Sequence, residues 1–274
     1  MRSMKPETFS ELLMFNTVRL VAKDGSSGTG FFYNFKVDDT QYPTIITNKH
    51  VVNNNPHEPM TFYLHLKTGD NESTENYQVT YTTDWIFHPD KDLCFCFINP
   101  VFEEVKKRTG KDVFCVANDD SIVATPEKLE ELSALEELVM VGYPIGLWDS
   151  QNNFPIFRKG TTASHPAIDF NQKGIGLVDM ACFPGSSGSP IFILNEIGYL
   201  DKSGNYYMNK RIVLIGILFA CPQYNAKGDI VVTTIPTQQK VRTSTPVMTN
   251  LGYYIKATEL KEFEAYIREN VHGK

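Results

Sequence analysis

The chain has 274 residues, of which 42% are hydrophobic and 21% charged, a composition that is typical of a globular protein and excludes a disordered one. Its 32 Asp and Glu residues outnumber its 26 Lys and Arg residues, so the net charge is -6. Without a basic excess to neutralise phosphates, we expect no nucleic-acid partner. The longest apolar stretch, Ile212 to Cys221, is too short for a membrane span, so we expect no membrane partner.

The N-terminal segment and the cysteines bear on the compartment. The charged first residues are not followed by an apolar run of the length that secretion signals have. The chain has five cysteines, an odd number, so at least one is unpaired in a monomer. Cys94 and Cys96 share one face of an apolar strand, with no second Cys or His pair at zinc-ligand spacing, which predicts core residues. We therefore predict a cytoplasmic protein that uses no metal and no cofactor.

Short strand-like segments separated by polar turns follow one another through the first part of the chain. Such spacing predicts an all-β barrel or sandwich rather than βαβ units. The Gly-Ser-Ser-Gly-Thr-Gly run from Gly25 lacks the Lys-Ser/Thr and the helix of a phosphate-binding loop, so it predicts a hairpin. The predicted strands are Thr17–Ala22, Thr29–Phe35, Pro43–Thr47, Phe62–Leu66, Tyr77–Tyr81 and Leu93–Ile98.

A helical pattern then interrupts the strands near the midpoint. Thr125 can cap a helix, Pro126 suits its first position, and leucines recur every three residues from Leu129. At the end of the chain, Thr258 is the expected N-cap of a helix whose apolar residues at 260, 263 and 267 share one face. The strands predicted between these helices are Glu137–Gly142, Ile156–Ser164, Gly176–Cys182, Pro190–Leu194, Arg211–Phe219, Ile230–Ile235 and Gly252–Ala257.

Three serines lie between glycines and prolines in the segment from Phe183 to Pro190. One interpretation is a Ser-rich turn without a function. The other is a tight turn that presents one hydroxyl and directs the N–H of Gly185 toward an oxyanion. A serine hydroxyl is a weak nucleophile until a base takes its proton, so this interpretation needs a base and a group that orients it. The chain offers His50 at the end of an apolar strand and Asp92 at the start of another.

These segments resemble the motifs of the trypsin/chymotrypsin-like serine peptidases. Thr47-Asn48-Lys49-His50 is similar to the family's T-x-x-H segment, Asp92-Leu93 to its D-[IL] strand start, and Gly185–Pro190 to its G-x-S-G-[GS]-P turn. The order His, Asp, Ser separates this family from α/β-hydrolases and subtilisins. The resemblance implies an all-β fold of two six-stranded antiparallel β-barrels, a short inter-barrel helix, a C-terminal helix, and an active site between the barrels.

The resemblance also implies roles and boundaries. His50 would be the general base and then the general acid, Asp92 would orient it, and Ser187 would form the acyl-enzyme. The N–H groups of Gly185 and Ser187 would form the oxyanion hole. The expected units are an N-terminal extension (1–16), a first β-barrel (17–117), a linker with a short helix (118–136), a second β-barrel (137–257) and a C-terminal helix (258–274).

The sequence departs from the secreted members of the family at two places. Val51 stands where secreted members carry a Cys beside the catalytic His, and Ser186 stands where zymogens place an Asp. We therefore expect no activation by N-terminal cleavage, and a closer likeness to HtrA-type and other bacterial members, without their PDZ domain. A bridge between Cys182 and Cys221 stays open as an alternative, although a cytosolic compartment favours free thiols.

The expected substrate pocket carries no charge. Ala181 lies at its floor, six residues before the nucleophile, and Ala220 and Gly252 are also uncharged. A Lys or Arg side chain would be buried there without a partner, at a cost of several kcal/mol. With Phe219 and Cys221 completing the pocket, we predict cleavage after an uncharged, apolar residue.

The favoured hypothesis is a serine endopeptidase that acts on proteins or peptides. Three alternatives remain open: a protein-binding or scaffold module with a blocked cleft, a latent protease that needs a regulatory partner, and an esterase that uses the same residues. The triad does not distinguish amide from ester substrates. A peptidase without zymogen control needs restraint, for which segments 53–76 and 222–251 are candidate elements.

Overall fold

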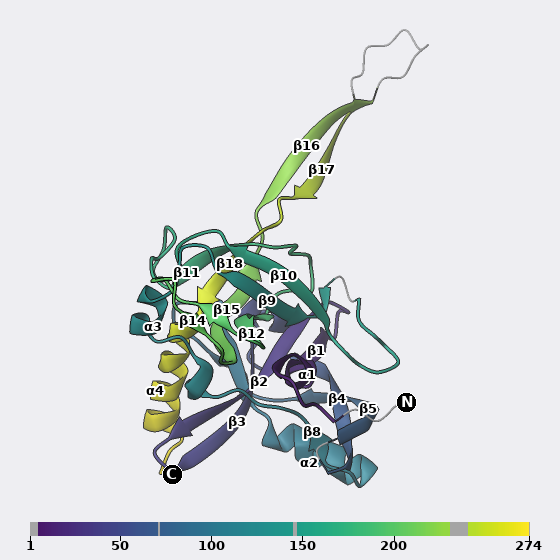
Figure 1. Cartoon of the computed structure of the whole chain (residues 1–274). Helices are drawn as coiled ribbons and strands as arrows, with labels where there is room; N and C mark the ends of the chain where they lie inside the picture. Colours follow the sequence, from purple (N-terminus) through teal and green to yellow (C-terminus); the bar gives the residue numbers. More distant parts are fainter. Residues whose placement is uncertain (1–4, 71, 145–146, 231–240, 274) are drawn as a thin grey trace.

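The computed structural model describes residues 5–70, 72–144, 147–230 and 241–273. The molecule has two β-rich halves, with short helices at its periphery and a long hairpin that projects from one end (Figure 1). The predicted all-β fold class is confirmed. Strand pairing is antiparallel throughout the two sheets that form these halves.

The first half is an eight-stranded sheet in the order β5-β4-β1-β2-β3-β7-β6, with β8 paired to β4. It thus has eight strands rather than the predicted six, because the short strands β6 and β8 add to the sheet. The strands are β1 (Thr17–Ala22), β2 (Ser27–Val37), β3 (Thr40–Thr47), β4 (Pro59–Gly69), β5 (Glu72–Thr82), β6 (Ile86–Phe87), β7 (Cys94–Phe97) and β8 (Val113–Phe114).

The second half is a closed barrel in the order β10-β11-β18-β15-β12-β9, which confirms the six-stranded barrel expected there. Strands β12 and β15 contain long runs of buried residues, because the core of the barrel covers one face and neighbouring elements cover the other. The barrel strands are β9 (Glu137–Gly142), β10 (Ile156–Thr162), β11 (Ile175–Asp179), β12 (Pro190–Asn195), β15 (Arg211–Ala220) and β18 (Leu251–Lys256).

Two hairpins are inserted between the barrel strands. The short one pairs β13 (Tyr199–Leu200) with β14 (Tyr206–Tyr207). The long one pairs β16 (Gln223–Ile230) with β17 (Val241–Met248) and extends away from the barrel (Figure 1). The strand expected at Ile230–Ile235 is therefore the end of β16 at Ile230, and the rest of that segment lies outside the described residues.

The helices only partly match the sequence pattern. Helix α3 (Pro126–Glu130) forms as expected, and the Oγ1 of Thr125 accepts the N–H of Lys128 at 3.3 Å. Helix α4 (Lys261–Asn270) begins later than expected: its N-cap is Leu260, not Thr258. The chain leaves β18 through a 3₁₀ helix, η4 (Ala257–Leu260), and this tighter turn includes Thr258.

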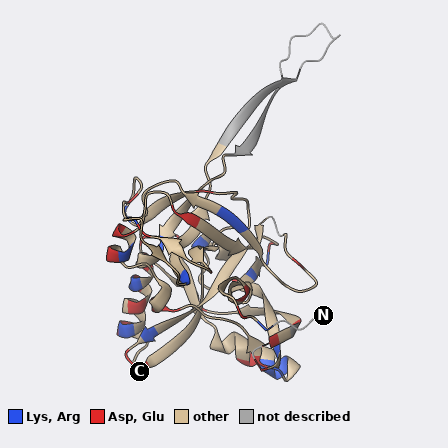
Figure 2. Cartoon of the chain, viewed as in Figure 1, with Lys and Arg blue, Asp and Glu red and all other residues tan. Residues whose placement is uncertain are grey.

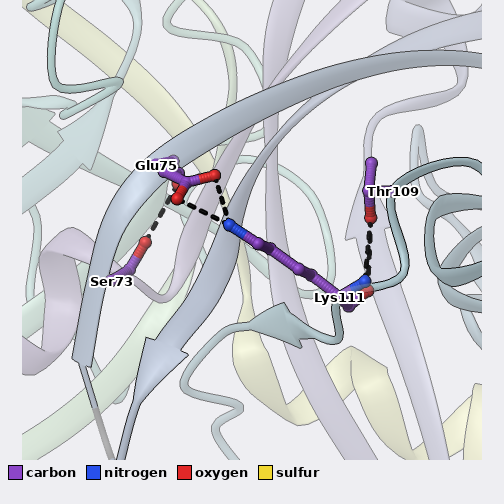
Figure 3. Close-up of polar contacts among 4 residues, drawn as sticks. All are labelled: Ser73, Glu75, Thr109 and Lys111. Carbon is purple, nitrogen blue, oxygen red and sulfur yellow. Dashed lines mark hydrogen bonds and ion pairs between the residues drawn. The ribbon is translucent and has the colours of Figure 1, made fainter.

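Helices α1 (Phe9–Met14) and α2 (Asn99–Thr109) were not predicted. Two further 3₁₀ helices are η1 (Lys49–Val52) and η2 (Asp120–Ile122). Figure 2 shows that charged residues are frequent on α2, α3 and α4, while the barrel strands are mostly uncharged. The segment after α2 is tied to β5 by Lys111, whose Nζ lies 2.6 and 2.7 Å from the carboxylate oxygens of Glu75 (Figure 3).

Helix α4 packs where the two halves meet. The ring of Phe263 lies 4.9 Å from that of Phe95 in β7 and 6.2 Å from that of Phe35 in β2. The same buried cluster includes Ile217 in β15. One apolar core therefore spans both halves and fixes β7 relative to the barrel.

All five cysteines are free thiols. The thiols of Cys94 and Cys96 are fully buried in β7, which confirms their prediction as core residues. Among the described residues, no helix has the length and hydrophobicity that a membrane span requires.

His65 in β4 makes the stability of the fold depend on pH. It is 6% exposed between the rings of Phe15 and Phe154, and burial lowers its pKa from 6.5 to about 4. In the unfolded chain His65 takes up a proton below pH 6.5, whereas in the folded chain it stays neutral until the pH approaches 4. The contribution of neutral His65 to the free energy of unfolding is therefore fully present above pH 6.5 and is lost as the pH falls toward 4.

We expect His65→Phe to lose less stability at acid pH than the wild type, by about 3 kcal/mol between pH 6.5 and 4. Urea unfolding of both proteins at several pH values measures this difference. Parallel losses in the two proteins would contradict a neutral, buried His65.

Candidate active site

Strand pairing brings His50 and Asp92 together. His50 lies in η1 directly after β3, and Asp92 lies just before β7, which pairs with β3 through Thr47 and Cys94. The Nδ1 of His50 lies 2.6 Å from Oδ2 of Asp92, and the backbone N–H of His50 donates to Oδ1 at 3.2 Å. An ionised carboxylate only accepts, so Nδ1 carries the proton and Nε2 is left as a free base.

The loop that carries Asp92 is also held by Asn48. The buried side-chain amide of Asn48 donates to the carbonyl oxygen of Asp92 at 2.7 Å. Asn48 belongs to the T-N-K-H segment, but sequence reasoning did not assign it a role. The position of Asn48 explains how the segment before His50 also fixes Asp92.

The residues before Ser187 form a tight turn. The N–H of Ser186 donates to the carbonyl oxygen of Phe183 at 2.9 Å. Pro184 at the second position and Gly185 at the third, with a φ of +86°, match the residue preferences of a type II turn. The buried Oγ of Ser186 accepts the N–H of Phe183 at 3.4 Å. The residue that replaces the zymogen aspartate therefore stabilises the turn from within.

This turn is bonded to the first half. The N–H of Thr29 donates to the carbonyl oxygen of Ser187 at 2.9 Å, and its Oγ1 donates to that of Gly185 at 3.1 Å. The Oγ1 of Thr47, at the end of β3, donates to the carbonyl oxygen of Thr29 at 2.7 Å. A Cβ at Gly188, whose φ is +84°, would lie 1.9 Å from that carbonyl oxygen, so this approach requires glycine. These contacts place Ser187 beside the strand that leads into η1.

The donors expected in an oxyanion hole are free. Within the described part of the chain, the N–H groups of Gly185 and Ser187 have no hydrogen-bond acceptor, and the hydroxyl of Ser187 makes no hydrogen bond. Unpaired N–H groups beside a nucleophile are what an oxyanion hole requires. In substrate-free active sites the hydrogen bond between the nucleophile and its base, here Ser187 and His50, commonly tightens only when substrate binds.

The predicted pocket residues come from adjacent strands of the barrel. Ala181 follows β11, Phe219 and Ala220 end β15, and both strands pair with β18, which contains Gly252. Cys221 follows Ala220 and packs against the barrel core. The topology therefore gathers these residues at one end of the barrel.

Cys182 and Cys221 are neighbours in this wall. A Cβ at Gly252 would lie 2.6 Å from the Sγ of Cys182, which is 1% exposed. A hydrogen bond between the two thiols raises the pKa of Cys182 and lowers that of Cys221. Of the two alternatives left open by the sequence, the structure has the free thiols.

Arg158 in β10 is a cation near the pocket that sequence reasoning missed. Its guanidinium lies 4.8 Å from the centre of the Phe183 ring, and its buried Nε has no hydrogen-bond partner among the described residues. No motif marks it, because its proximity depends on how β10 curves past the Ser187 turn.

The fold, the His50–Asp92 pair and the turn that carries Ser187 are those of a trypsin-like hydrolase. The model of the family described as "Trypsin-like peptidase domain" matches residues 28–198. The chain belongs to this family and is a serine protease. This confirms the resemblance found in the sequence. No curated protein matches the chain.

Among solved structures, the chain is similar to a thermostable serine protease, AL20, from an extremophilic microorganism, with 11% identity, 94% of this chain and 99% of that chain covered, and a TM-score of 0.48. It is also similar to Deg5, with 15% identity, coverage of 77% and 81%, and a TM-score of 0.45. A serine protease of human pathogenic astrovirus gives 12% identity, coverage of 89% and 91%, and a TM-score of 0.43.

Proposed function

We propose that the protein is a serine endopeptidase that uses His50, Asp92 and Ser187 and forms an acyl-enzyme on Ser187. The observation that carries this proposal is the 2.6 Å contact between His50 Nδ1 and Asp92 Oδ2, beside a turn that leaves two N–H groups unpaired. The orientation of His50 by the carboxylate leaves Nε2 as the atom that takes the proton from Ser187.

In the first half-reaction, the Oγ of Ser187 attacks the substrate carbonyl carbon while Nε2 of His50 takes the hydroxyl proton. The N–H groups of Gly185 and Ser187 donate to the oxyanion. Asp92 stabilises the imidazolium, which then gives its proton to the leaving amine. A water molecule, deprotonated by Nε2, hydrolyses the ester and releases Ser187.

Burst kinetics test this mechanism directly. With an activated ester, we expect one equivalent of leaving group to be released rapidly, followed by slower turnover that is limited by deacylation. Faster steady turnover of esters, with no cleavage of any peptide, would instead favour the esterase alternative.

We further propose that cleavage follows an uncharged, apolar residue, since Ala181, Ala220 and Gly252 offer no carboxylate to a basic side chain. In a panel of peptides that vary only at the residue before the scissile bond, we expect the highest kcat/KM for apolar residues. Fastest cleavage after Lys or Arg would contradict this. Fastest cleavage after Asp or Glu would point to Arg158 as the determinant instead.

The remaining proposals concern the setting of the activity. The five free thiols support a cytoplasmic location. The turn held by Ser186 supports activity without N-terminal cleavage, so restraint would come from narrow specificity or from a regulatory partner. If the folded protein gives no burst, the binding or scaffold module and the latent enzyme become the better explanations.

A further inference from the structure

A buried histidine lies inside the loop that carries Asp92. His88 has a side chain that is 1% exposed, and its Nδ1 accepts two backbone N–H groups, from Asp90 at 3.2 Å and from Lys91 at 3.0 Å. The N–H of His88 donates to the carbonyl oxygen of Leu93 at 2.9 Å. The imidazole therefore holds the two amides that precede Asp92, while the backbone of His88 bonds the residue that follows Asp92.

This bonding pattern requires a neutral ring of one tautomer. An Nδ1 that accepts two N–H groups has no proton, so the proton of neutral His88 is on Nε2. That atom lies 3.7 Å from Oε2 of Glu259 and has no hydrogen-bond partner among the described residues. A second proton could only go to Nδ1, where it would point at the two donors of the loop.

The surroundings of His88 come from the first half and from the C-terminal helical segment. Asp90 and Lys49 belong to the first half, and Glu259 and Glu262 belong to η4 and α4. The ring also lies 5.5 Å from that of Phe263 in α4. Burial lowers the pKa of His88 below 6.5; Lys49 adds to this, while Glu262, Asp90 and the backbone of Glu259 oppose it.

The same loop is tied to the barrel by Lys91, whose Nζ donates to the carbonyl oxygen of Lys173. The adjacent Gly174 accepts at its carbonyl oxygen from the N–H of Lys256, at the end of β18, at 2.8 Å. The loop that carries Asp92, the barrel and the C-terminal segment are therefore linked next to His88.

We propose that neutral His88 is a positioning residue for Asp92, and that its protonation loosens the loop and inactivates the site at acid pH. This inference rests on the proposed function, because it assigns His88 a role through the carboxylate that orients His50. It assigns no contact with substrate to His88.

Two substitutions separate the role of the acceptor from that of the ring. An Asn at position 88 keeps a side-chain oxygen that can accept N–H groups two and three residues ahead, as in an Asx turn. A Leu fills similar apolar space but accepts nothing. We expect His88→Leu to lower kcat by about 10²-fold with little change in KM, since a small misplacement of a catalytic group has effects of this size. We expect His88→Asn to restore most of kcat.

The pH profile gives a readout that a purely structural role would not move. In the wild type, the acid limb of log(kcat/KM) should be steeper by one proton than in His88→Asn, because protonation of His88 adds a second inactivating step. The matched control is His57→Asn, because His57 is exposed and pairs with Asp84 at 2.9 Å outside this loop. It should leave kcat and the profile unchanged.

An NMR measurement tests the inference independently of activity. Long-range ¹H–¹⁵N spectra of the intact protein should show His88 as the Nε2–H tautomer, with a titration below pH 6.5. A wild type that hydrolyses nothing, but shows this tautomer, would overturn the proposed function and not the bonding of His88. An Nδ1–H tautomer, a folded His88→Leu with wild-type kcat, or identical acid limbs in the wild type and His88→Asn would overturn the inference.

Discussion

Replacement of Ser187 by alanine is expected to abolish peptide hydrolysis and to leave the fold intact. The substitution removes the nucleophilic Oγ but keeps the backbone carbonyl that accepts the N–H of Thr29. Losses after removal of a catalytic serine reach about 10⁶-fold in kcat, so only residual turnover should remain. Steady-state hydrolysis and thermal unfolding of the same preparation measure the two effects.

Ser189 provides the matched control for this experiment. It lies in the same turn, is fully buried, and its Oγ has no hydrogen-bond partner among the described residues. Removal of an unpaired buried hydroxyl is close to neutral. Ser189→Ala should therefore keep its activity. Loss of activity in Ser189→Ala, with retention in Ser187→Ala, would show that Ser187 is not the nucleophile.

Replacement of Asp92 by asparagine is expected to lower kcat by about 10⁴-fold with little change in KM, the size of effect seen when this carboxylate is replaced in the family. An asparagine amide can donate to Nδ1 of His50, which would move the imidazole proton to Nε2. The atom that should accept the proton of Ser187 would then carry one already. Kinetics over a range of pH values measure the loss.

A second His–Asp pair in the same half supplies the comparison. His57 and Asp84 lie 2.9 Å apart, but both side chains are largely exposed, at 70% and 85%. Asp84→Asn should change neither kcat nor KM. Equal losses in the two variants would mean that the orientation of His50 does not depend on Asp92.

The sequence predicted the parts of the site that are short motifs with strict chemistry. His50, Asp92 and the Gly185–Pro190 turn stand at the ends of apolar segments, and the pairing of β3 with β7 brings His50 and Asp92 into contact. The contacts between segments were not predictable, because Thr29, Thr47 and Arg158 act only through the pairing and curvature of distant strands. His88 escaped notice for a similar reason: its role depends on loop closure and on burial by α4.

The fold shows the same division. The limits of β1 and β9 match the predicted strands, since alternation and turn residues mark them clearly. Helix α2 was missed because its buried face consists of only two valines, Val101 and Val105, one turn apart. The start of α4 was misplaced because a 3₁₀ turn precedes the helix. The domain boundaries at 117 and 136 stay a prediction.

The most direct test of the proposed triad is the site of covalent modification by a fluorophosphonate. Such a probe reacts with a serine only when a neighbouring base activates its hydroxyl. After reaction of the folded, intact protein, peptide mapping by mass spectrometry should find one adduct, on Ser187, which is absent in Ser187→Ala and strongly reduced in Asp92→Asn. An adduct on any other serine, or no adduct on folded protein, would contradict a triad of His50, Asp92 and Ser187.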